Sequence, residues 1–167
     1  MKILVVGGIG YIGSHMLKRF KETNYDIEIL DNLSSGQKEN TLNYKLHVCD
    51  LSDKETVYKI LSEQNYDLVM HFAASINVEE SYNNPKKYQQ NNVINTINLL
   101  DCMKDLKINK FIFSSSAAVY GEPEHLPVTE LHPFNPVNPY GDTKAEVEKI
   151  LKSYEESCGL KYVSLRY

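Results

Sequence analysis

The 167-residue sequence predicts an α/β protein built on one doubly wound parallel sheet. Short apolar runs recur along the chain, and each is continuous in hydrophobicity, as in strands that are buried on both faces. Segments with helical spacing separate these runs, and a glycine-rich loop follows the first run and opens the first helix. Repeated strand–helix units of this kind require right-handed crossovers, so their strands form a parallel sheet with helices on both faces.

The expected strands are short and rich in Val, Ile, Leu and Phe. They span residues 3–6, 27–30, 46–49, 68–72, 111–113 and 162–165. In an open sheet of this kind, ligands bind at the carboxyl ends of the strands. We therefore expect the functional residues to lie immediately after these runs.

The first two expected helices each have an apolar face. In the first, this face is the stripe Ile12, Met16 and Phe20. Residues 52–55, with the sequence Ser-Asp-Lys-Glu, have the form of a capping box, in which Ser52 caps the second helix. That helix would bury Val57, Ile60 and Leu61.

Two later helices are expected to begin at the pairs Asn84-Pro85 and Asn138-Pro139. The Asn can cap the helix, and Pro fits the first helical position because no N–H is needed there. Gly159 is expected to end the last helix. Residues 121–137 contain four prolines and predict a surface loop.

The composition fits a single domain spanning residues 1–167, because 42% of the residues are hydrophobic. The net charge of -4 and the scattered basic residues disfavour nucleic acid and anionic membranes as partners. The first apolar run ends at Gly7, too early for a secretion signal or a membrane span, which predicts a cytoplasmic protein. Cys49, Cys102 and Cys158 lack CxxC spacing, so we expect reduced thiols and no metal site.

A dinucleotide fingerprint follows the first expected strand. Residues 8–13 satisfy GxGxxG through Gly8, Gly10 and Gly13, and Gly7 adds an overlapping GxxGxxG pattern. Glycines here let backbone N–H groups approach a pyrophosphate at the positive end of a helix. Asp31 ends the second strand, where a carboxylate accepts hydrogen bonds from an adenosine ribose and repels a 2′-phosphate, which favours NAD. The alternative for Asp31 is a solvated loop residue.

Tyr140 and Lys144 are four residues apart and share one face of the last expected helix. An ammonium at this position can stabilise the phenolate, which suggests redox acid/base chemistry. Taken alone, the same pair is also an ordinary feature of a helix surface. Ser116 follows the fifth strand and has two interpretations, a hydroxyl that bonds nearby backbone or a hydroxyl that binds a reacting group.

These motifs together resemble the extended short-chain dehydrogenase/reductases, the NAD-dependent epimerase/dehydratase family, and most closely its nucleotide-sugar 4-epimerases. The resemblance covers the chain nearly end to end. It rests on residues 6–15, 31–33, 50–51, 71–74, 91–93, 113–121, 139–144 and 165–167. The resemblance implies a Rossmann fold with NAD as cofactor and a UDP-hexose as substrate.

The resemblance also implies the chemistry of the site. Tyr140 would take the proton of the sugar 4-hydroxyl while hydride passes from C4 to NAD. The 4-keto intermediate would rotate and be reduced on its opposite face, which interconverts UDP-glucose and UDP-galactose. Lys144 would bind the nicotinamide ribose and lower the pKa of Tyr140, and Ser116 would hydrogen-bond the reacting oxygen of the substrate.

The remaining contacts carried over from the resemblance surround the cofactor. Backbone N–H groups of Tyr11 and Ile12, in a loop shaped by Gly7, Gly10 and Gly13, would bind the pyrophosphate of the cofactor. Asn32, Ser35 and Gly36 would lie near the adenosine ribose and phosphate, and Asp50 and Leu51 would bracket the adenine. The nicotinamide side would be lined by Phe72, Ala73, Ala74, Asn91, Ser114 and Tyr167. Each of these could equally be ordinary packing, and Phe72 in particular could be a core residue.

Ala117 and Ala118 occupy the positions where related sugar-nucleotide 4,6-dehydratases carry an acidic residue. Without a carboxyl group to protonate the departing hydroxyl, 4-epimerisation or simple oxidoreduction is favoured over dehydration.

Members of the family continue for about as long again beyond the sixth strand. We therefore expect a C-terminal substrate domain to be missing, and the 167 residues to be inactive and to bind NAD weakly at best. Two alternatives remain, a non-catalytic dinucleotide-binding fragment and another sugar-nucleotide oxidoreductase.

The family also suggests a homodimer formed through helices 85–106 and 139–157. Val93, Ile97, Leu100 and Met103 form a stripe on the first of these helices, but the stripe could instead face the sheet.

Overall fold

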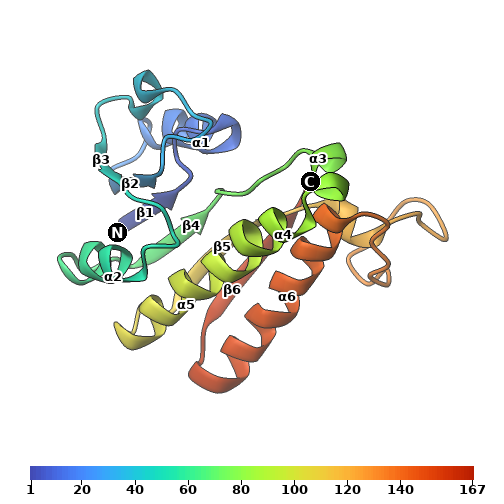
Figure 1. Ribbon diagram of the computed structural model, residues 1–167. Coiled ribbons are helices and arrows are strands. Elements are labelled where there is room, and N and C mark those ends of the chain that lie inside the picture. The colour runs from blue at the N-terminus through green and yellow to red at the C-terminus, as the bar shows by residue number, and fades with distance from the viewer.

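The computed structural model describes residues 1–167 and contains one six-stranded sheet (Figure 1). All neighbouring strands are parallel, in the order β3-β2-β1-β4-β5-β6. The strands are β1 (Lys2–Val6), β2 (Asp26–Asp31), β3 (Lys45–Val48), β4 (Leu68–His71), β5 (Lys110–Ser115) and β6 (Lys161–Arg166). The prediction of a doubly wound parallel sheet is confirmed, and the strand order reverses between β1 and β4.

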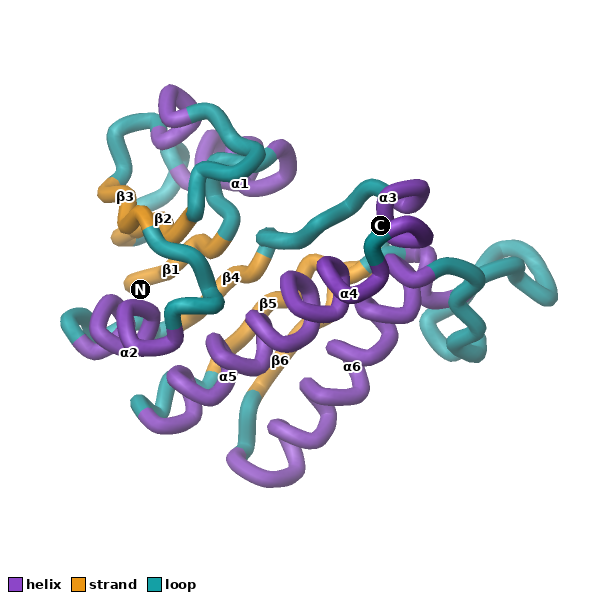
Figure 2. Tube along the Cα trace, in the orientation of Figure 1, coloured by secondary structure: helices purple, strands orange, loops and turns teal.

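Helices cover both faces of the sheet, with α1 on one face and α2, α5 and α6 on the other (Figures 1 and 2). The α-helices are α1 (Tyr11–Phe20), α2 (Lys54–Ser62), α3 (Val78–Asn83), α4 (Pro85–Tyr88), α5 (Asn95–Asp105) and α6 (Pro139–Cys158). Shorter helical segments are the 3-10 helices η1 (Lys38–Thr41) and η3 (Ala117–Tyr120) and the π-helix η2 (Gln89–Ile94).

The buried face of α1 differs from the predicted stripe. Gly13, Leu17 and Phe20 are buried, whereas Ile12 is exposed and Met16 is half-buried. A side chain at position 13 would collide with the carbonyl oxygen of Gly7, so the helix can approach β1 only through Gly13. That contact turns residues 13, 17 and 20 toward the sheet and leaves Ile12 at the side.

The helix ends follow the sequence signals in part. Asn138 caps α6 by accepting a hydrogen bond from the N–H of Gly141 at 2.8 Å, and Gly159 ends it with a φ of 72°, both as predicted. Asp53 caps α2 in place of Ser52, because its carboxylate accepts from the N–H of Thr56 at 3.1 Å and from the Thr56 hydroxyl at 2.7 Å. Asn84 precedes α4 but makes no side-chain cap.

The predicted helix 85–106 is a continuous helical segment with a π-helical stretch in its middle. Inserted turns of this kind are rare in helices and are frequent at functional sites. Val93, Leu100 and Met103 belong to the core cluster between the helices and the sheet. The stripe on this segment therefore faces the interior of the protein.

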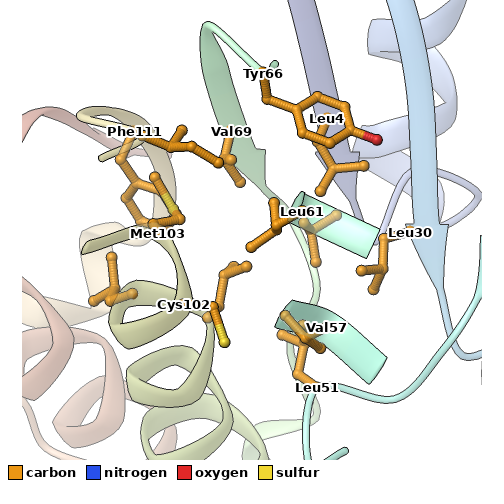
Figure 3. Close-up of a cluster of buried hydrophobic side chains, with 14 of the residues drawn as sticks. Leu4, Leu30, Leu51, Val57, Leu61, Tyr66, Val69, Cys102, Met103 and Phe111 are labelled. Atoms are coloured by element: carbon orange, nitrogen blue, oxygen red, sulfur yellow. The ribbon is translucent and has the colours of Figure 1, made fainter. Parts of the chain in front are cut away.

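The hydrophobic core has a layer on each face of the sheet. The larger layer joins α2, α5 and α6 to the strands, and Figure 3 shows part of it, with Leu61, Cys102 and Phe111 packed between α2, α5 and the sheet. The prediction that every strand is buried on both faces is wrong for β3 and β6, where Val48 and Val163 are 60% and 53% exposed. These two strands form the edges of the sheet, where packing covers them incompletely.

Residues 121–137 form an irregular, mostly exposed loop, as predicted, and this loop projects from the end of the molecule (Figure 2). Cys49 and Cys102 are buried free thiols and Cys158 is an exposed one. None of the helices combines the length and the apolar character needed to cross a membrane.

Candidate active site

The residues singled out by the sequence gather at the carboxyl ends of the strands, on either side of the point where the strand order reverses. The glycine loop follows β1, Asp31 ends β2, and residues 72–74 follow β4. Ser114 and Ser115 end β5, and the first turns of α6 bring Tyr140 and Lys144 to the same edge. This edge of a doubly wound sheet is the usual place for a ligand.

The glycine loop is too closely packed for any other residue at two positions. Gly7 has a φ of 73°, and a Cβ there would lie 2.4 Å from the nitrogen of Ala73. A Cβ on Gly13 would lie 2.3 Å from the Gly7 oxygen. The loop therefore brings the backbones of β1, α1 and the segment after β4 into close contact.

The N-terminus of α1 opens directly from this loop. Gly10 is the N-cap residue and has no side chain to cap the helix. The first-turn N–H groups, including those of Tyr11 and Ile12, have no partner one turn earlier within the helix. Such a turn carries partial positive charge and suits a pyrophosphate, so the loop fits the phosphates of a dinucleotide.

Asp31 is a buried residue, only 8% exposed, so its interpretation as a solvated loop residue is wrong. One carboxylate oxygen accepts from the N–H of Ile9 at 3.2 Å and the other accepts from the N–H of Leu33 at 2.9 Å. Asp31 therefore fixes the glycine loop against the turn that follows β2. Each oxygen retains acceptor capacity for a ribose hydroxyl.

The residues predicted near the adenosine are only partly brought together. Asn32 donates to the Asp50 carboxylate at 2.6 Å, and Gly36 packs against the backbone of Ile9. Burial works against the Asp50 charge, but hydrogen bonds from Ser52 and Asn32 hold its pKa below the ordinary value. Ser35 is exposed, and Leu51 packs in the core cluster beside α2.

On the nicotinamide side, the segment after β4 lies against both core layers. Phe72 is half-buried and packs on the cluster beneath α1, which agrees with its alternative role as a core residue. Ala73 packs against Gly7, and Ala74 is half-buried beside it.

Lys144 is the most unusual charged residue of the site because it is only 3% exposed. Its Nζ donates to the carbonyl oxygen of Ser114 at 2.8 Å, and lies 4.8 Å from the ring centre of Phe113 and 5.8 Å from that of Tyr140. Burial lowers the pKa of Lys144 to about 7. The amine therefore has one strong acceptor and room in its hydrogen-bonding capacity for ligand hydroxyls.

Ser116 caps the 3-10 helix η3, because its Oγ accepts from the N–H of Ala118 at 3.1 Å. The backbone-bonding interpretation of this serine is confirmed, and its hydroxyl proton is still free to be donated. The next N–H, that of Ala117, donates to the carbonyl oxygen of Tyr167 at 2.7 Å. The side chain of Tyr167 is 58% exposed.

Asn92 has a central place that the sequence did not reveal. Its side-chain oxygen accepts from the Ser75 N–H at 2.8 Å and from the Asn91 amide at 3.2 Å. Its amide donates to the Ser75 oxygen at 3.0 Å and to the Thr143 hydroxyl at 3.1 Å. Thr143 in turn donates to the carbonyl of Tyr140 at 2.7 Å. Asn92 thus ties the segment after β4 to the Tyr140 turn, and in the sequence it was one of several polar residues among residues 89–98, with nothing to single it out beyond the motif 91–93.

His71, at the end of β4, is fully buried and neutral. Thr96 donates its only hydroxyl proton to the carbonyl of Asn92, so the His71 Nε2, 2.9 Å from Thr96 Oγ1, must carry a proton. Burial first, and then the charge of Lys144, lower the pKa of His71 to about 3. Its Nδ1 has no hydrogen-bond partner. No group of three or more potential metal ligands converges in the structure.

Comparison with known proteins gives a consistent relationship over the whole chain. Residues 3–167 match the sequence model of the NAD dependent epimerase/dehydratase family. The chain is 45% identical to the UDP-glucose 4-epimerase of Lactobacillus helveticus over 168 aligned residues, which cover 100% of this chain and 51% of that protein.

Solved structures of related proteins agree with this relationship. The UDP-glucose 4-epimerase of Brucella ovis in complex with NAD has a TM-score of 0.97 at 41% identity, covering 99% of this chain and 51% of that one. The UDP-N-acetylglucosamine 4-epimerase of Methanobrevibacter ruminantium, in complex with UDP-N-acetylmuramic acid, has a TM-score of 0.91 at 42% identity, covering 99% of this chain and 54% of that one. The chain spans about half the length of each of these relatives.

Proposed function

The chain belongs to the NAD dependent epimerase/dehydratase family, and from this premise we propose that its protein interconverts UDP-glucose and UDP-galactose by epimerisation at C4. The 167 residues would supply the NAD site and the acid/base pair. The observation that carries the proposal is the placement of Lys144, buried beside Tyr140 and bonded to the end of β5. A buried lysine with a lowered pKa next to a tyrosine is a typical arrangement for proton transfer.

NAD would lie across the carboxyl edge of the sheet. The glycine loop and the first turn of α1 would hold its pyrophosphate, and Asp31 would accept hydrogen bonds from the adenosine ribose. Lys144 would donate to the hydroxyls of the nicotinamide ribose. These acceptors would favour the charged form of the amine and raise its pKa, which offsets the effect of burial.

The reaction needs a group that can take and return one proton at the sugar 4-hydroxyl. Tyr140, ionised to a phenolate that charged Lys144 would stabilise, would remove this proton while the C4–H bond breaks and would become a neutral phenol. The Ser116 hydroxyl would donate a hydrogen bond to the 4-oxygen of the sugar. NAD, when bound, would supply the hydride acceptor and donor that inversion at C4 needs. Tyr140 would then return the proton, so enzyme and cofactor end each cycle unchanged.

The preference for epimerisation over dehydration rests on the segment after Ser116. Ala117 and Ala118 begin η3 and offer no acid to protonate a departing hydroxyl. The named relatives are 4-epimerases of UDP-glucose or UDP-N-acetylglucosamine, which supports a UDP-hexose substrate. UDP-glucose is the first choice because it is named for the relatives with the larger TM-scores.

The test is to incubate the protein with UDP-galactose and to quantify UDP-glucose by ion-exchange chromatography. We expect interconversion that Tyr140→Phe abolishes, since this variant keeps the ring and removes the proton carrier. A folded wild-type protein that binds NAD but does not interconvert the two sugars would refute the assignment. UDP-N-acetylglucosamine should be assayed in parallel to define the tolerance for the N-acetyl group.

A second candidate is a dinucleotide-binding unit that does not turn over a sugar by itself. It is favoured by one observation, that the chain spans about half the length of its relatives while containing all the predicted NAD contacts. Isothermal titration of the 167 residues with NAD, run beside the epimerisation assay, separates the candidates, because NAD binding without epimerisation supports the second one.

We also propose that the protein is a cytoplasmic enzyme of galactose metabolism. We further propose that it forms a homodimer through helices 85–106 and 139–157. The family resemblance supports the dimer, whereas the stripe of Val93, Leu100 and Met103 does not, since it is buried in the core. Light scattering at increasing concentration tests it, and a monomer at every concentration would refute it.

A further inference from the structure

Glu148 is a third functional candidate on the face of α6 that carries Tyr140 and Lys144, because each is one turn from the next. Its carboxylate is 7% exposed. One oxygen accepts from the Ser115 hydroxyl at 2.6 Å and from Arg166 Nε at 3.0 Å, and the other accepts from Arg166 Nη2 at 2.7 Å. The pair with Arg166 is therefore a bidentate, charge-assisted contact of fixed geometry.

Arg166 extends this contact to the segments that follow β5. Its Nη1 donates to the Tyr120 hydroxyl at 2.7 Å and to the carbonyl oxygen of Glu130 at 3.1 Å. The guanidinium also lies 4.7 Å from the ring centre of Phe134 and 5.3 Å from that of Tyr120. One side chain of β6 thus binds η3 and the loop 121–137 together.

These contacts enclose Ser116 from both sides. The residue before it, Ser115, is bonded to Glu148 on α6, and the N–H of the residue after it, Ala117, is bonded to the carbonyl of Tyr167 beside Arg166. Ser116 itself makes no hydrogen bond with either charged residue. Its place relative to α6, and so to Tyr140, is set by the neighbours on each side.

Stability alone does not explain this ion pair, in which Glu148 is buried and the Arg166 side chain is 22% exposed. Buried pairs contribute little net stability compared with apolar residues of the same size, because both charges lose their hydration. What a bidentate pair provides is a fixed distance between the elements that carry it. Here those elements are α6, which carries the acid/base pair, and β6, and the same Glu148 carboxylate also binds Ser115 at the end of β5, next to Ser116.

We propose that Glu148 and Arg166 are positioning residues that hold Ser116 and Tyr140 on the same reacting oxygen. This inference rests on the proposed function, since it assigns the pair a role in that reaction. A displacement of about 1 Å at a reacting group can lower the rate about 100-fold, so loss of the pair is expected to lower kcat more than it weakens substrate binding.

The test compares Glu148→Gln and Arg166→Lys with Glu28→Gln. Glu28 is a matched control, since it is equally buried and accepts hydrogen bonds or ion pairs from Lys2, His47 and Tyr66 on a strand away from Ser116. We expect kcat to fall about tenfold or more in both test variants while KM changes less than about twofold. The double variant should lose no more than the worse single variant, because the pair acts as a unit. Glu28→Gln should keep the kcat of the wild type.

Two kinetic outcomes would overturn the inference. One is a folded Glu148→Gln or Arg166→Lys variant with wild-type kcat, and the other is an equal loss of kcat in Glu28→Gln. If Glu148→Gln does not fold, Arg166→Lys decides alone, since it keeps the charge and removes only the fork geometry.

A measurement without turnover separates this inference from the proposed function. Amide hydrogen exchange should become faster at Ala117, Ala118 and Val119 in Arg166→Lys and should not change there in Glu28→Gln. Unchanged protection of these three amides would overturn the inference whether or not the protein epimerises a sugar. If the wild-type protein is inactive but exchange at these amides becomes faster in Arg166→Lys, the proposed function is refuted and the positioning contact is established.

Discussion

Replacing Lys144 with methionine should stabilise the fold at neutral pH, although the residue is proposed to be essential for the reaction. Methionine keeps the length and apolar stem of the side chain and removes the amine. Burial lowers the pKa of Lys144 from 10.5 to about 7, so the folded protein at pH 7 holds an amine that would be fully charged in the unfolded chain. Functional sites often carry such destabilising groups.

The size of the effect follows from this difference in pKa. Each pKa unit corresponds to about 1.4 kcal/mol, so burial of the amine costs about 4 kcal/mol at pH 7. The methionine variant gives up the hydrogen bond to the Ser114 oxygen and leaves that buried acceptor unpaired, a loss of about 2 kcal/mol. We therefore expect Lys144→Met to raise the free energy of unfolding by about 2 kcal/mol at pH 7.

The pH dependence gives the sharper test. The cost of burial is fully present below pH 7, where the amine is charged in both states, and it disappears as the pH rises toward 10.5, where the amine is neutral in both. At pH 10 it should be about 1 kcal/mol, so the variant should then be about 1 kcal/mol less stable than the wild type. The order of the two proteins should reverse between pH 7 and pH 10.

Urea unfolding followed by circular dichroism at both pH values measures this reversal. Lys152→Met is the control, because Lys152 lies on the same helix and is exposed, and it should show no pH-dependent change relative to the wild type. If Lys144→Met differs from the wild type by the same amount at pH 7 and pH 10, the argument from burial is wrong.

Three further predictions concern the glycine loop, the ribose site and acid stability. Gly13→Ala should lower NAD affinity and thermal stability, because its Cβ would lie 2.3 Å from the Gly7 oxygen, whereas Gly159→Ala, which meets no atom within 4 Å, should lose only about 1 kcal/mol from its φ of 72°. Calorimetry with NAD and thermal melts check this pair, and equal losses would contradict it. Asp31→Ala should weaken NAD binding by more than about 1 kcal/mol, and titration showing unchanged affinity would remove Asp31 from the ribose site. For Glu28, burial opposes the charge but hydrogen bonds from His47, Lys2 and Tyr66 prevail and lower its pKa from 4.5 to about 2. Its stabilising effect is present above pH 4.5 and is lost as the pH falls toward 2, so acid titration should show Glu28→Gln to be less acid-sensitive than the wild type.

Several elements could be predicted because their signals are local. The apolar runs are strands in the structure, and the Asn138-Pro139 pair and Gly159 mark the ends of α6. A cap or a turn depends on the residue itself and on neighbours within about one helical turn, which the sequence contains in full.

Other predictions failed where a competing contact decided the outcome. Ser52 does not cap α2, because the Asp53 carboxylate binds both the N–H and the hydroxyl of Thr56 and takes the cap position. Ile12 does not face the sheet, because Gly13 makes the close approach to Gly7. In both cases the local pattern was correct in kind and displaced by one residue.

The Tyr140 and Lys144 pair shows which features follow from the sequence and which follow only from the tertiary structure. The sequence by itself determined the alternation of strands and helices, the glycine fingerprint after β1 and the spacing that puts the two side chains on one helix face. All of these are short-range patterns, and they sufficed to indicate the family. Only the tertiary structure decided that Lys144 is buried with a pKa of about 7, that Asn92 joins the segment after β4 to the Tyr140 turn, and that Glu148 and Arg166 enclose the neighbours of Ser116. Burial and hydrogen bonding between residues far apart in the chain arise only when the sheet and helices pack together, so no local pattern contains them.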